Sequence, residues 1–310
     1  MSADITLPAG APEEVVTNAL VRDIDLAAFG GKGSMALITL DNGHDHNRPN
    51  TFGPQSVKAL DAAITDAIAR KPAAIAITGK PFIFAAGADL SALSFLSDRN
   101  QSLAIGKLGH DVFRRLGESS IPTFAFINGL ALGGGLEVGL HCHYRTVAST
   151  AFTALPEVFL GLVPGWGGAT ILPKLIGPER AVQVIMLNAL NNNTMMKAKD
   201  ALKLGVVDAM FEPADFLERS IGFAVNVLNG STKIERADYS NDPAWDSALA
   251  TGKAAALKKY GGAQIASPTK ALELIAAART NTLGEGFDAE DQVLADLTMS
   301  DPLRASLYAF

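Results

Sequence analysis

The chain has 310 residues, of which 48% are hydrophobic and 19% charged, so it suits one large folded unit or one unit with a helical addition. Its net charge of −6 argues against a nucleic-acid partner and against binding to an anionic membrane. The single cysteine, Cys142, excludes an internal disulfide and is expected to be a buried, unreactive side chain. Neither a secretory signal nor a long apolar span is evident, so we expect a cytoplasmic protein.

The first half of the chain alternates between predicted strands and helices. An apolar run at 35–40 predicts a strand, and apolar residues at helical spacing over 54–70 predict a helix. A strand at 73–78, a helix at 101–116 and a strand at 123–127 follow. This order favours a parallel sheet covered by helices, with ligands at the carboxyl ends of its strands.

The second half of the chain is predicted to be largely helical. A polar break interrupts it at 229–245, and no catalytic cluster is evident in the last third, which we interpret as a helical addition or an interface. The expected units are a disordered tail at 1–14, a core at 15–205 and a helical C-terminal region at 206–310. The predicted helices cover residues 178–187, 197–204, 213–228, 247–260, 268–278 and 287–297.

Two acidic residues stand out in the apolar segment between Ser119 and Pro178. Glu137 follows a run of three glycines, and Glu157 precedes a second glycine cluster. Burying a carboxylate in such surroundings costs free energy unless something compensates for its lost hydration. Two of them, each beside backbone that a ligand can approach closely, predict an acid/base pair in a dry pocket. A purely structural role for both is the weaker interpretation, because both acids occur with such loops.

Two loops of small residues are expected to present backbone N–H groups to a ligand. In the loop 84–90, FAAGADL, Asp89 is placed to cap the following helix. The run at 133–135 opens another helix, where free N–H groups favour negative charge. Two such donors on one oxygen would form an oxyanion hole. A carbonyl polarised there, beside two carboxylates, suggests proton transfer at its α-carbon and water activation at its β-carbon.

Four motifs occur in order between residues 35 and 211: FAAGADL, INGLALGGGLEVGLHC, LPEVFLGLVPGWGGATILPKLIG and AKDALKLGVVDAMF. Together they resemble the crotonase (enoyl-CoA hydratase/isomerase) superfamily. The resemblance implies an α/β fold, a crotonase-type spiral core of repeated ββα units with a helical C-terminal region. Residues 242–310 resemble the segment that closes the hydratase/isomerase half of multifunctional fatty-acid oxidation proteins. No GxGxxG follows a strand, so we expect the dehydrogenase half of those proteins to be absent from this chain.

The resemblance also implies a role for individual residues. Ala88 and Gly134 match the two backbone donors that hold the thioester oxygen. Glu157 would exchange the proton at C2, Glu137 would activate the water added at C3, and the Gly165 N–H would help to position that water. The first loop would receive coenzyme A through the backbone of Ala86, Gly87, Ala88, Asp89 and Leu90.

The implied reaction is hydration of trans-2-enoyl-CoA to 3-hydroxyacyl-CoA in fatty-acid β-oxidation, with coenzyme A entering as part of the substrate and no other cofactor. Three alternatives stay open: a Δ3-Δ2-enoyl-CoA isomerase using mainly Glu157, a non-catalytic acyl-CoA-binding subunit of a β-oxidation complex, and a fragment of a longer multifunctional enzyme. By resemblance we also expect a homotrimer or hexamer, and association with a hydroxyacyl-CoA dehydrogenase or a thiolase.

Other residues give weaker signals. His44 and His46 lie in a polar turn, and we interpret them as part of a solvated loop, so that no metal site is expected. No Gly-x-Ser-x-Gly occurs, which argues against a serine nucleophile. Trp166 suits either a pocket wall or the core. Phe82 stands where relatives often have a lysine and His143 where they usually have an aspartate, and the second position is interpreted as structural.

Overall fold

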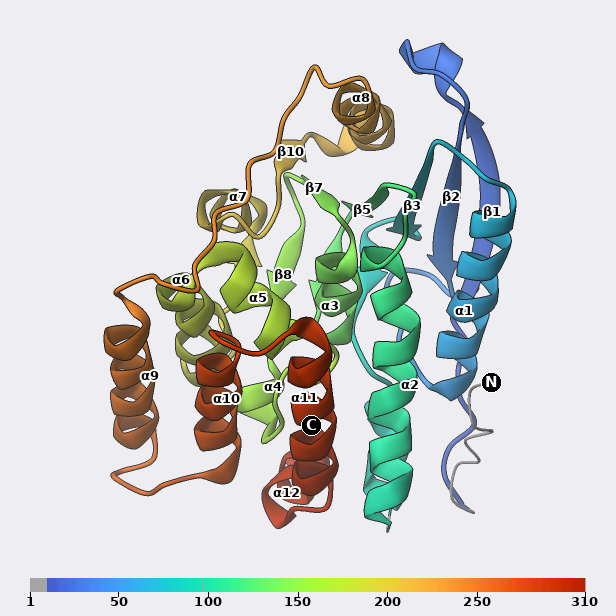
Figure 1. Ribbon diagram of the computed structural model, residues 1–310. Helices are drawn as coiled ribbons and strands as arrows, with labels where there is room; N and C mark the ends of the chain where they lie inside the picture. Colours follow the sequence, from blue (N-terminus) through green and yellow to red (C-terminus); the bar gives the residue numbers. More distant parts are fainter. Residues whose placement is uncertain (1–9, 97, 310) are drawn as a thin grey trace.

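The computed structural model describes residues 10–96 and 98–309, and within them the strands form two sheets (Figure 1). The six-stranded sheet has the order β1-β2-β3-β5-β7-β10 and the four-stranded sheet the order β4-β6-β8-β9. The larger sheet consists of β1 (Asn18–Asp25), β2 (Ser34–Asp41), β3 (Ala74–Gly79), β5 (Thr123–Ile127), β7 (Tyr144–Ala148) and β10 (Ala209–Phe211). The smaller consists of β4 (Ile83–Ala85), β6 (Leu130–Leu132), β8 (Phe152–Ala154) and β9 (Met196–Lys197).

The larger sheet is parallel from β2 to β10, as the alternation of strands and helices predicted. Only β1 runs antiparallel, pairing with β2 along its whole length. Every residue of β3 and β5 is buried, because helices and the smaller sheet cover both faces. Strands buried on both sides read as continuous apolar runs, which is why these two were found in the sequence.

Three consecutive segments repeat one ββα unit. Each contributes a strand to the larger sheet, a short strand to the smaller sheet and then a helix. The units are β3–β4–α2, β5–β6–α3 and β7–β8–α4, with α2 at Arg99–Gly117, α3 at Gly134–His141 and α4 at Glu157–Leu160. These units confirm the predicted spiral core. The short strands escaped prediction because three residues are too few to show a period of two.

The remaining helices cover the sheets and extend the fold (Figure 1). In the view of Figure 1, α9, α10 and α11 lie in a row that continues to α2, and consecutive members of this row contact each other. The α-helices are α1 (Pro54–Ala69), α5 (Gly168–Ile176), α6 (Pro178–Val182), α7 (Ala198–Leu204), α8 (Phe216–Leu228), α9 (Trp245–Lys259), α10 (Ala266–Ala277), α11 (Leu283–Thr298) and α12 (Asp301–Ala309). The 3₁₀ helices η1 (Leu26–Phe29), η2 (Leu90–Phe95) and η4 (Pro213–Asp215) and the π-helix η3 (Gln183–Asn188) complete the order.

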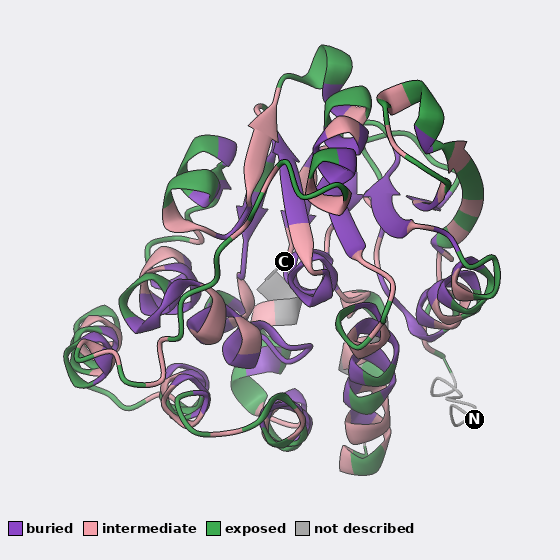
Figure 2. Ribbon diagram, turned by 45° about the horizontal axis from the view of Figure 1, so that its top comes forward, coloured by how far each residue is buried: buried purple, intermediate pink, exposed green. Residues whose placement is uncertain are grey.

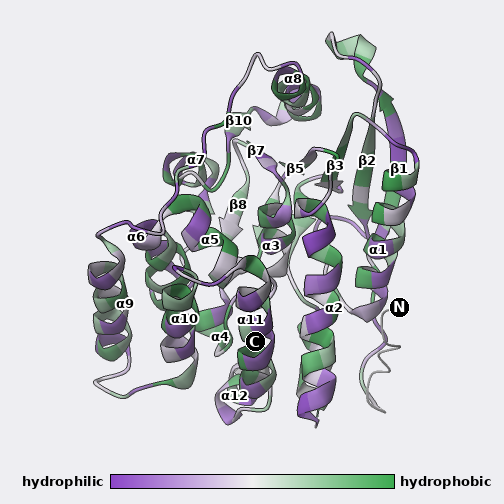
Figure 3. Cartoon of the chain, in the orientation of Figure 1, coloured by the Kyte–Doolittle hydropathy of each residue, from purple (hydrophilic) through white to green (hydrophobic). Residues whose placement is uncertain are grey.

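The core lies between the sheets and the helices. Figure 2 shows buried residues along the strands and on the inner sides of the helices, and Figure 3 shows that hydrophobic residues follow the same distribution. Cys142 is 3% exposed, as predicted, and burial raises the pKa of its thiol to about 12, so it stays protonated near neutral pH. None of the helices among the described residues is both long and apolar enough to cross a membrane.

Two of the expected boundaries need correction. Residues 1–9 of the predicted tail lie outside the described residues, but Glu14 is not part of a disordered tail. Its carboxylate accepts the backbone N–H groups of Gln55 and Ser56, and so caps α1, whose own N-cap residue is a glycine. The boundary at 205 divides the larger sheet, because β10 pairs with β7 and α8 packs beside β10 and β5. We therefore propose that the core ends after α8.

Candidate active site

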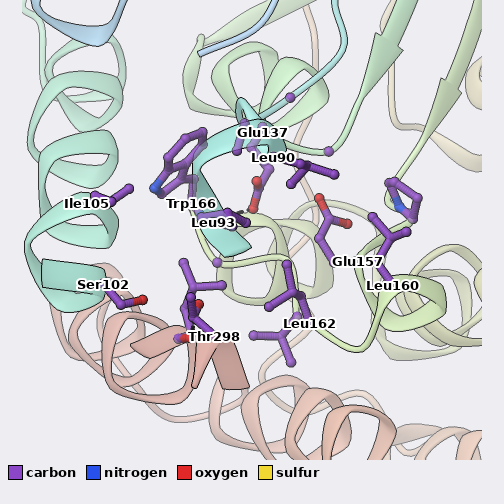
Figure 4. Close-up of a pocket in the computed structure, with 18 of the residues that line it drawn as sticks. Leu90, Leu93, Ser102, Ile105, Glu137, Glu157, Leu160, Leu162, Trp166 and Thr298 are labelled. Carbon is purple, nitrogen blue, oxygen red and sulfur yellow. Dashed lines mark hydrogen bonds between the residues drawn. The ribbon is translucent and has the colours of Figure 1, made fainter. Parts of the chain in front are cut away.

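A cavity of about 90 Å³ lies where α2, α3, α4 and α11 meet the loop after β4 (Figure 4). Its wall is mostly apolar, with Leu93, Leu162 and Leu294 among the side chains that face it. The structure brings eight of the nine residues predicted for the site to this one cavity: Ala86, Gly87, Ala88, Leu90, Gly134, Glu137, Glu157 and Gly165. Asp89 is the exception. Its side chain accepts the Ser91 N–H at 3.0 Å and caps η2, as predicted.

The backbone N–H groups of Ala88 and Gly134 lie side by side at the cavity. A methyl group added to Gly134 would lie 3.6 Å from the Ala88 nitrogen, and one added to Gly87 would lie 3.2 Å from the Gly134 nitrogen. Gly134 is the first residue of α3, so the helix leaves its N–H without an intrahelical partner. Ala88 is paired with Phe52 in a parallel β-bridge, in which the Gly87 carbonyl accepts the Phe52 N–H and the Asp89 N–H donates to the Phe52 carbonyl. The N–H of Ala88 itself therefore points away from Phe52. Both are therefore free to bind one oxygen.

Glycine is required at Gly134, which is one of these donors, and at the preceding residue, Gly133. At Gly134 a methyl group would lie 2.5 Å from the Trp166 ring, so any side chain would push the ring away. At Gly133 a methyl group would lie 2.5 Å from Oε1 of Glu157, and the backbone there has φ +52°, which other residues rarely adopt. The glycine run thus begins α3 and also lets the side chains of Trp166 and Glu157 lie close to the backbone.

Glu137 extends from the first turn of α3 and is 2% exposed. Its Oε1 accepts two backbone N–H groups, from Trp166 and Gly168, each at 2.8 Å. Burial is the largest influence on this carboxyl and, with the charge of Glu290, raises its pKa to about 7, although the two hydrogen bonds oppose the change. A carboxyl group with such a pKa can both accept and release a proton near neutral pH.

Glu157 opens α4 on the other side of the cavity. In Figure 4 the carboxyl groups of Glu137 and Glu157 reach into the same space, with Trp166 beside Glu137. The Oε2 atom of Glu157 is sealed from solvent and has no hydrogen-bond partner among the described residues. Burial and then the charge of Glu137 raise the pKa of Glu157 well above its usual value, so this carboxyl favours the protonated form.

The loop between α4 and α5 supplies the rest of the wall. A methyl group on Gly165 would meet the Leu294 side chain at 2.9 Å, so this glycine lets α11 close over the cavity. Trp166, for which the sequence allowed two roles, fills both. It lines the cavity, and its ring packs edge-on against Phe113 in the core. The backbone carbonyl of Trp166 accepts the Nε2–H of His141, whose pKa burial lowers to about 3, so this histidine is neutral.

Three buried ionisable residues behind the site were not found in the sequence. His110 on α2 contacts Asp291 through Nδ1 at 2.7 Å and Glu290 through Nε2 at 3.1 Å. Burial alone would lower the pKa of His110, but the hydrogen bonds to these two carboxyl groups outweigh it and raise the pKa to about 9. A signal did exist. On α11, Phe287, Glu290, Asp291 and Leu294 follow the i, i+3, i+4, i+7 spacing of a buried helix face, which places two acids inside the protein.

Within residues 10–96 and 98–309, no group of three or more His, Cys, Asp or Glu side chains is arranged to hold a metal ion. His143, one of the two departures from the family pattern, has a structural contact, because its Nδ1 lies 3.1 Å from the backbone nitrogen of Thr123 and accepts its N–H. Phe82, the other departure, is 67% exposed and lies outside the cavity wall.

The family model described as enoyl-CoA hydratase/isomerase matches residues 30–260, well over half of the chain. The chain belongs to the enoyl-CoA hydratase/isomerase family. The alpha subunit of a fatty acid oxidation complex from Shewanella loihica is 31% identical over 284 residues, which cover 87% of this chain and 38% of that protein. The corresponding subunit from Idiomarina loihiensis is 34% identical over 244 residues, covering 76% and 33%.

The chain spans less than two fifths of the length of these curated relatives. Among solved structures, a carnitinyl-CoA dehydratase from Mycobacterium thermoresistibile matches with a TM-score of 0.68 at 21% identity, covering 94% of this chain and 89% of the other. At that identity the likeness shows the fold. The α/β crotonase fold with helices at its C-terminal end is thereby confirmed.

Proposed function

We propose that this chain is an enoyl-CoA hydratase, which adds water across the double bond of trans-2-enoyl-CoA to give 3-hydroxyacyl-CoA in fatty-acid β-oxidation. One observation carries the proposal: two carboxyl groups, Glu137 and Glu157, reach one apolar cavity beside the N–H groups of Ala88 and Gly134. Family membership and the names of the relatives, subunits of fatty acid oxidation complexes, support this class of substrate.

The thioester carbonyl is proposed to lie against the two free N–H groups. As water adds at C3, negative charge develops on the thioester oxygen, and the N–H groups of Ala88 and Gly134 stabilise it. Such donors act strongly in a dry cavity and need no reorganisation during the reaction. Coenzyme A enters as part of the substrate, so the reaction needs no other cofactor. The backbone of residues 86–90 is proposed to receive the coenzyme A moiety.

The two glutamates divide the proton transfers. Ionised Glu137 takes a proton from water, the resulting hydroxyl bonds to C3, and the C2=C3 electron pair moves toward the thioester. Protonated Glu157 then gives its proton to C2, which completes the addition. This division agrees with the pKa of Glu137, about 7, and with the raised pKa of Glu157. A proton must return from Glu137 to Glu157 before the next turnover, and the Gly165 N–H is proposed to position the water.

The alternative within the family is a Δ3-Δ2-enoyl-CoA isomerase, in which one carboxyl moves a proton between C2 and C4. Glu157 alone could do this, since its Oε2 has no protein partner in the described part of the chain. Isomerisation has no need of a second carboxyl, however, and Glu137 is both held by two N–H groups and directed to the same cavity. The presence of both therefore favours hydration.

The test is to assay the purified chain with a trans-2-enoyl-CoA and a 3-enoyl-CoA side by side, over short, medium and long acyl chains. We expect hydration of the 2-enoyl substrate to be the faster reaction. Isomerisation alone would overturn the proposal in favour of the isomerase. Tight acyl-CoA binding without either reaction would instead indicate the non-catalytic binding subunit.

Assembly is a separate proposal. We propose a homotrimer or hexamer that associates with a hydroxyacyl-CoA dehydrogenase or a thiolase, since the relatives are named as subunits of fatty acid oxidation complexes. Light scattering of the purified chain measures the first part, and a monomer would exclude it. Titration with the candidate partner enzymes, followed by the same measurement, tests the second.

A further inference from the structure

Helix α11 brings a carboxyl group to the back of the site that the proposed reaction does not use. Glu290 is fully buried, with 0% exposure. Its Oε2 accepts the Gly167 N–H at 2.6 Å and lies 3.1 Å from Nε2 of His110. Its other oxygen, Oε1, is buried and has no hydrogen-bond partner among the residues that the structure describes. Burying a carboxyl this deeply is costly, so its position needs an explanation.

Glu290 and Glu137 between them accept the backbone N–H groups of three consecutive residues. The N–H groups of Trp166 and Gly168 donate to Glu137, and the N–H between them, of Gly167, donates to Glu290. Gly167 has φ +106°, and at this left-handed turn its N–H bonds to a different carboxyl from those of its neighbours. The N–H that Glu290 accepts thus lies between the two donors that orient Glu137.

The α2–α11 interface is built around Glu290. His110 lies between Glu290 and Asp291, and its ring stacks on Phe287 with centroids 4.7 Å apart. A side chain at Gly106 would meet Asp291, because an added methyl group would lie 2.9 Å from Oδ1. Since both ring nitrogens of His110 face carboxyl oxygens, the imidazolium form satisfies both contacts. The side chains of His110, Glu290 and Asp291 thus form a hydrogen-bonded support for the α2–α11 interface. The His110 side chain is 3% exposed.

We infer that Glu290 is a positioning residue for Glu137: by holding the Gly167 N–H, it sets the backbone so that the Trp166 and Gly168 N–H groups keep the Glu137 carboxyl directed into the cavity. The inference rests on the proposed function, in which Glu137 is the base. Glu290 also acts through its charge, because after burial it is the largest influence that raises the pKa of Glu137. The ionisable groups whose charges interact with Glu137 are His110 on α2, Glu157 on α4 and Glu290 on α11.

Two variants separate the effect of the hydrogen bond between Gly167 and Glu290 from the effect of the Glu290 charge. Glu290→Gln keeps an oxygen that can accept the Gly167 N–H but removes the negative charge. Without that charge the titration midpoint of Glu137 should fall by about one pH unit. Glu290→Asp keeps the charge on a side chain one methylene shorter, which withdraws the acceptor from Gly167. We expect kcat to fall about tenfold with KM within about twofold, because orientation rather than substrate binding is lost.

Three measurements read these effects. Carbon NMR of ¹³C-labelled glutamate carboxyls follows the midpoint of Glu137, whose signal is identified by its absence in Glu137→Gln. Amide hydrogen exchange at Gly167 reports the lost bond in Glu290→Asp. Steady-state kinetics give kcat and KM. Asp288→Asn, an exposed change on the same helix, is the control and should leave all three as in the wild type. Circular dichroism checks that each variant is folded.

The outcomes distinguish the inference from the proposed function. A Glu137 midpoint that does not fall in Glu290→Gln, or an unchanged kcat in Glu290→Asp despite faster exchange at Gly167, would overturn the inference. If the wild type shows no hydration but the Glu137 midpoint falls in Glu290→Gln, the proposed function fails and the link between the two glutamates stands. The NMR measurement needs no turnover, so it remains decisive in either case.

Discussion

The Oε1 atom of Glu137 lies 2.8 Å from the backbone nitrogen of Trp166 and accepts its N–H. The Gly168 N–H donates to the same oxygen, so the backbone fixes the direction of the carboxyl group. Burial opposes ionisation of Glu137 and the two donors favour it, and the balance leaves its pKa at about 7. The carboxyl is thus oriented and is half-ionised near neutral pH, which suits a general base.

Replacing Glu137 with glutamine should abolish hydration. The variant keeps an oxygen for the Trp166 and Gly168 N–H groups but cannot take a proton from water, so we expect kcat to fall by a factor of about 10²–10⁴. Binding of a saturated acyl-CoA, measured by calorimetry, should stay within about twofold, because the change leaves the apolar wall intact. Turnover near that of the wild type would exclude Glu137 as the base.

Glu157→Gln should lose two activities, hydration and double-bond migration. The proposed proton transfer at C2 belongs to both hydration and double-bond migration, so both activities should fall by a factor of about 10²–10⁴. Parallel assays with 2-enoyl- and 3-enoyl-CoA check this. A variant that loses hydration but still migrates the double bond would place the C2 proton on another group.

Gly134→Ala should impair catalysis, because its methyl group would lie 2.5 Å from the Trp166 ring. The ring or α3 must move, which displaces the Gly134 N–H from the thioester oxygen, and we expect kcat to fall by a factor of about 10²–10³. Overpacking should also lower the free energy of unfolding by about 1–3 kcal/mol. Thermal unfolding and kcat measure the two effects.

Gly139→Ala on the same helix is the matched control. A methyl group there would lie 3.5 Å from the Ala125 side chain, an ordinary contact, and alanine favours the helix by about 0.5–1 kcal/mol. It should be active and at least as stable as the wild type. Equal kcat in the Gly134 and Gly139 variants would argue against the proposed oxyanion hole.

Hydration should accelerate as the pH rises through about 7, the pKa of Glu137. The base works only when ionised, so below this value kcat/KM should drop about tenfold for each pH unit. The rate should fall once the pH passes the raised pKa of Glu157, because this carboxyl must be protonated to donate to C2. The measurement is kcat/KM over a series of buffers, and a rate that declines through pH 7 would contradict these roles.

Stability should decrease as the pH rises from 6.5 to about 9. Folding raises the pKa of His110 from 6.5 to about 9, so protonated His110 stabilises the folded state. This stabilisation is complete below pH 6.5 and is lost as the pH passes about 9. The raised pKa of Glu137 adds the same trend between 4.5 and about 7, because it too binds a proton more tightly in the folded state. Unfolding temperature against pH measures both.

His110→Gln tests the part of the pH dependence of stability that we assign to His110. It should lower the free energy of unfolding by about 3–5 kcal/mol near neutral pH, because Glu290 and Asp291 lose their buried cation. The variant should also lose the decline above about pH 7.5, since the group that releases the proton is gone. The same decline in variant and wild type would mean that His110 is not its source.

Local pattern was enough for most of the long helices and for three strands of the larger sheet, whereas the eight-residue strand β1 (Asn18–Asp25) was not predicted. The helix over 54–70 and the strand over 123–127 lie in the structure almost where they were predicted, because periodicity and apolar runs are properties of neighbouring residues. The strands of the smaller sheet were not found, since each is stabilised by a partner far along the chain rather than by its own residues.

The sequence by itself determined the chemistry available: two acids in apolar surroundings, two loops of small residues and the family that they indicate. Only the tertiary structure decided which carboxyl oxygen meets which N–H, and that Glu290, 123 residues beyond Gly167, supports the same turn of backbone. The physical reason is that burial, hydrogen bonding and the pKa of a carboxyl depend on what packs around it. Those neighbours come from segments whose meeting no local pattern records.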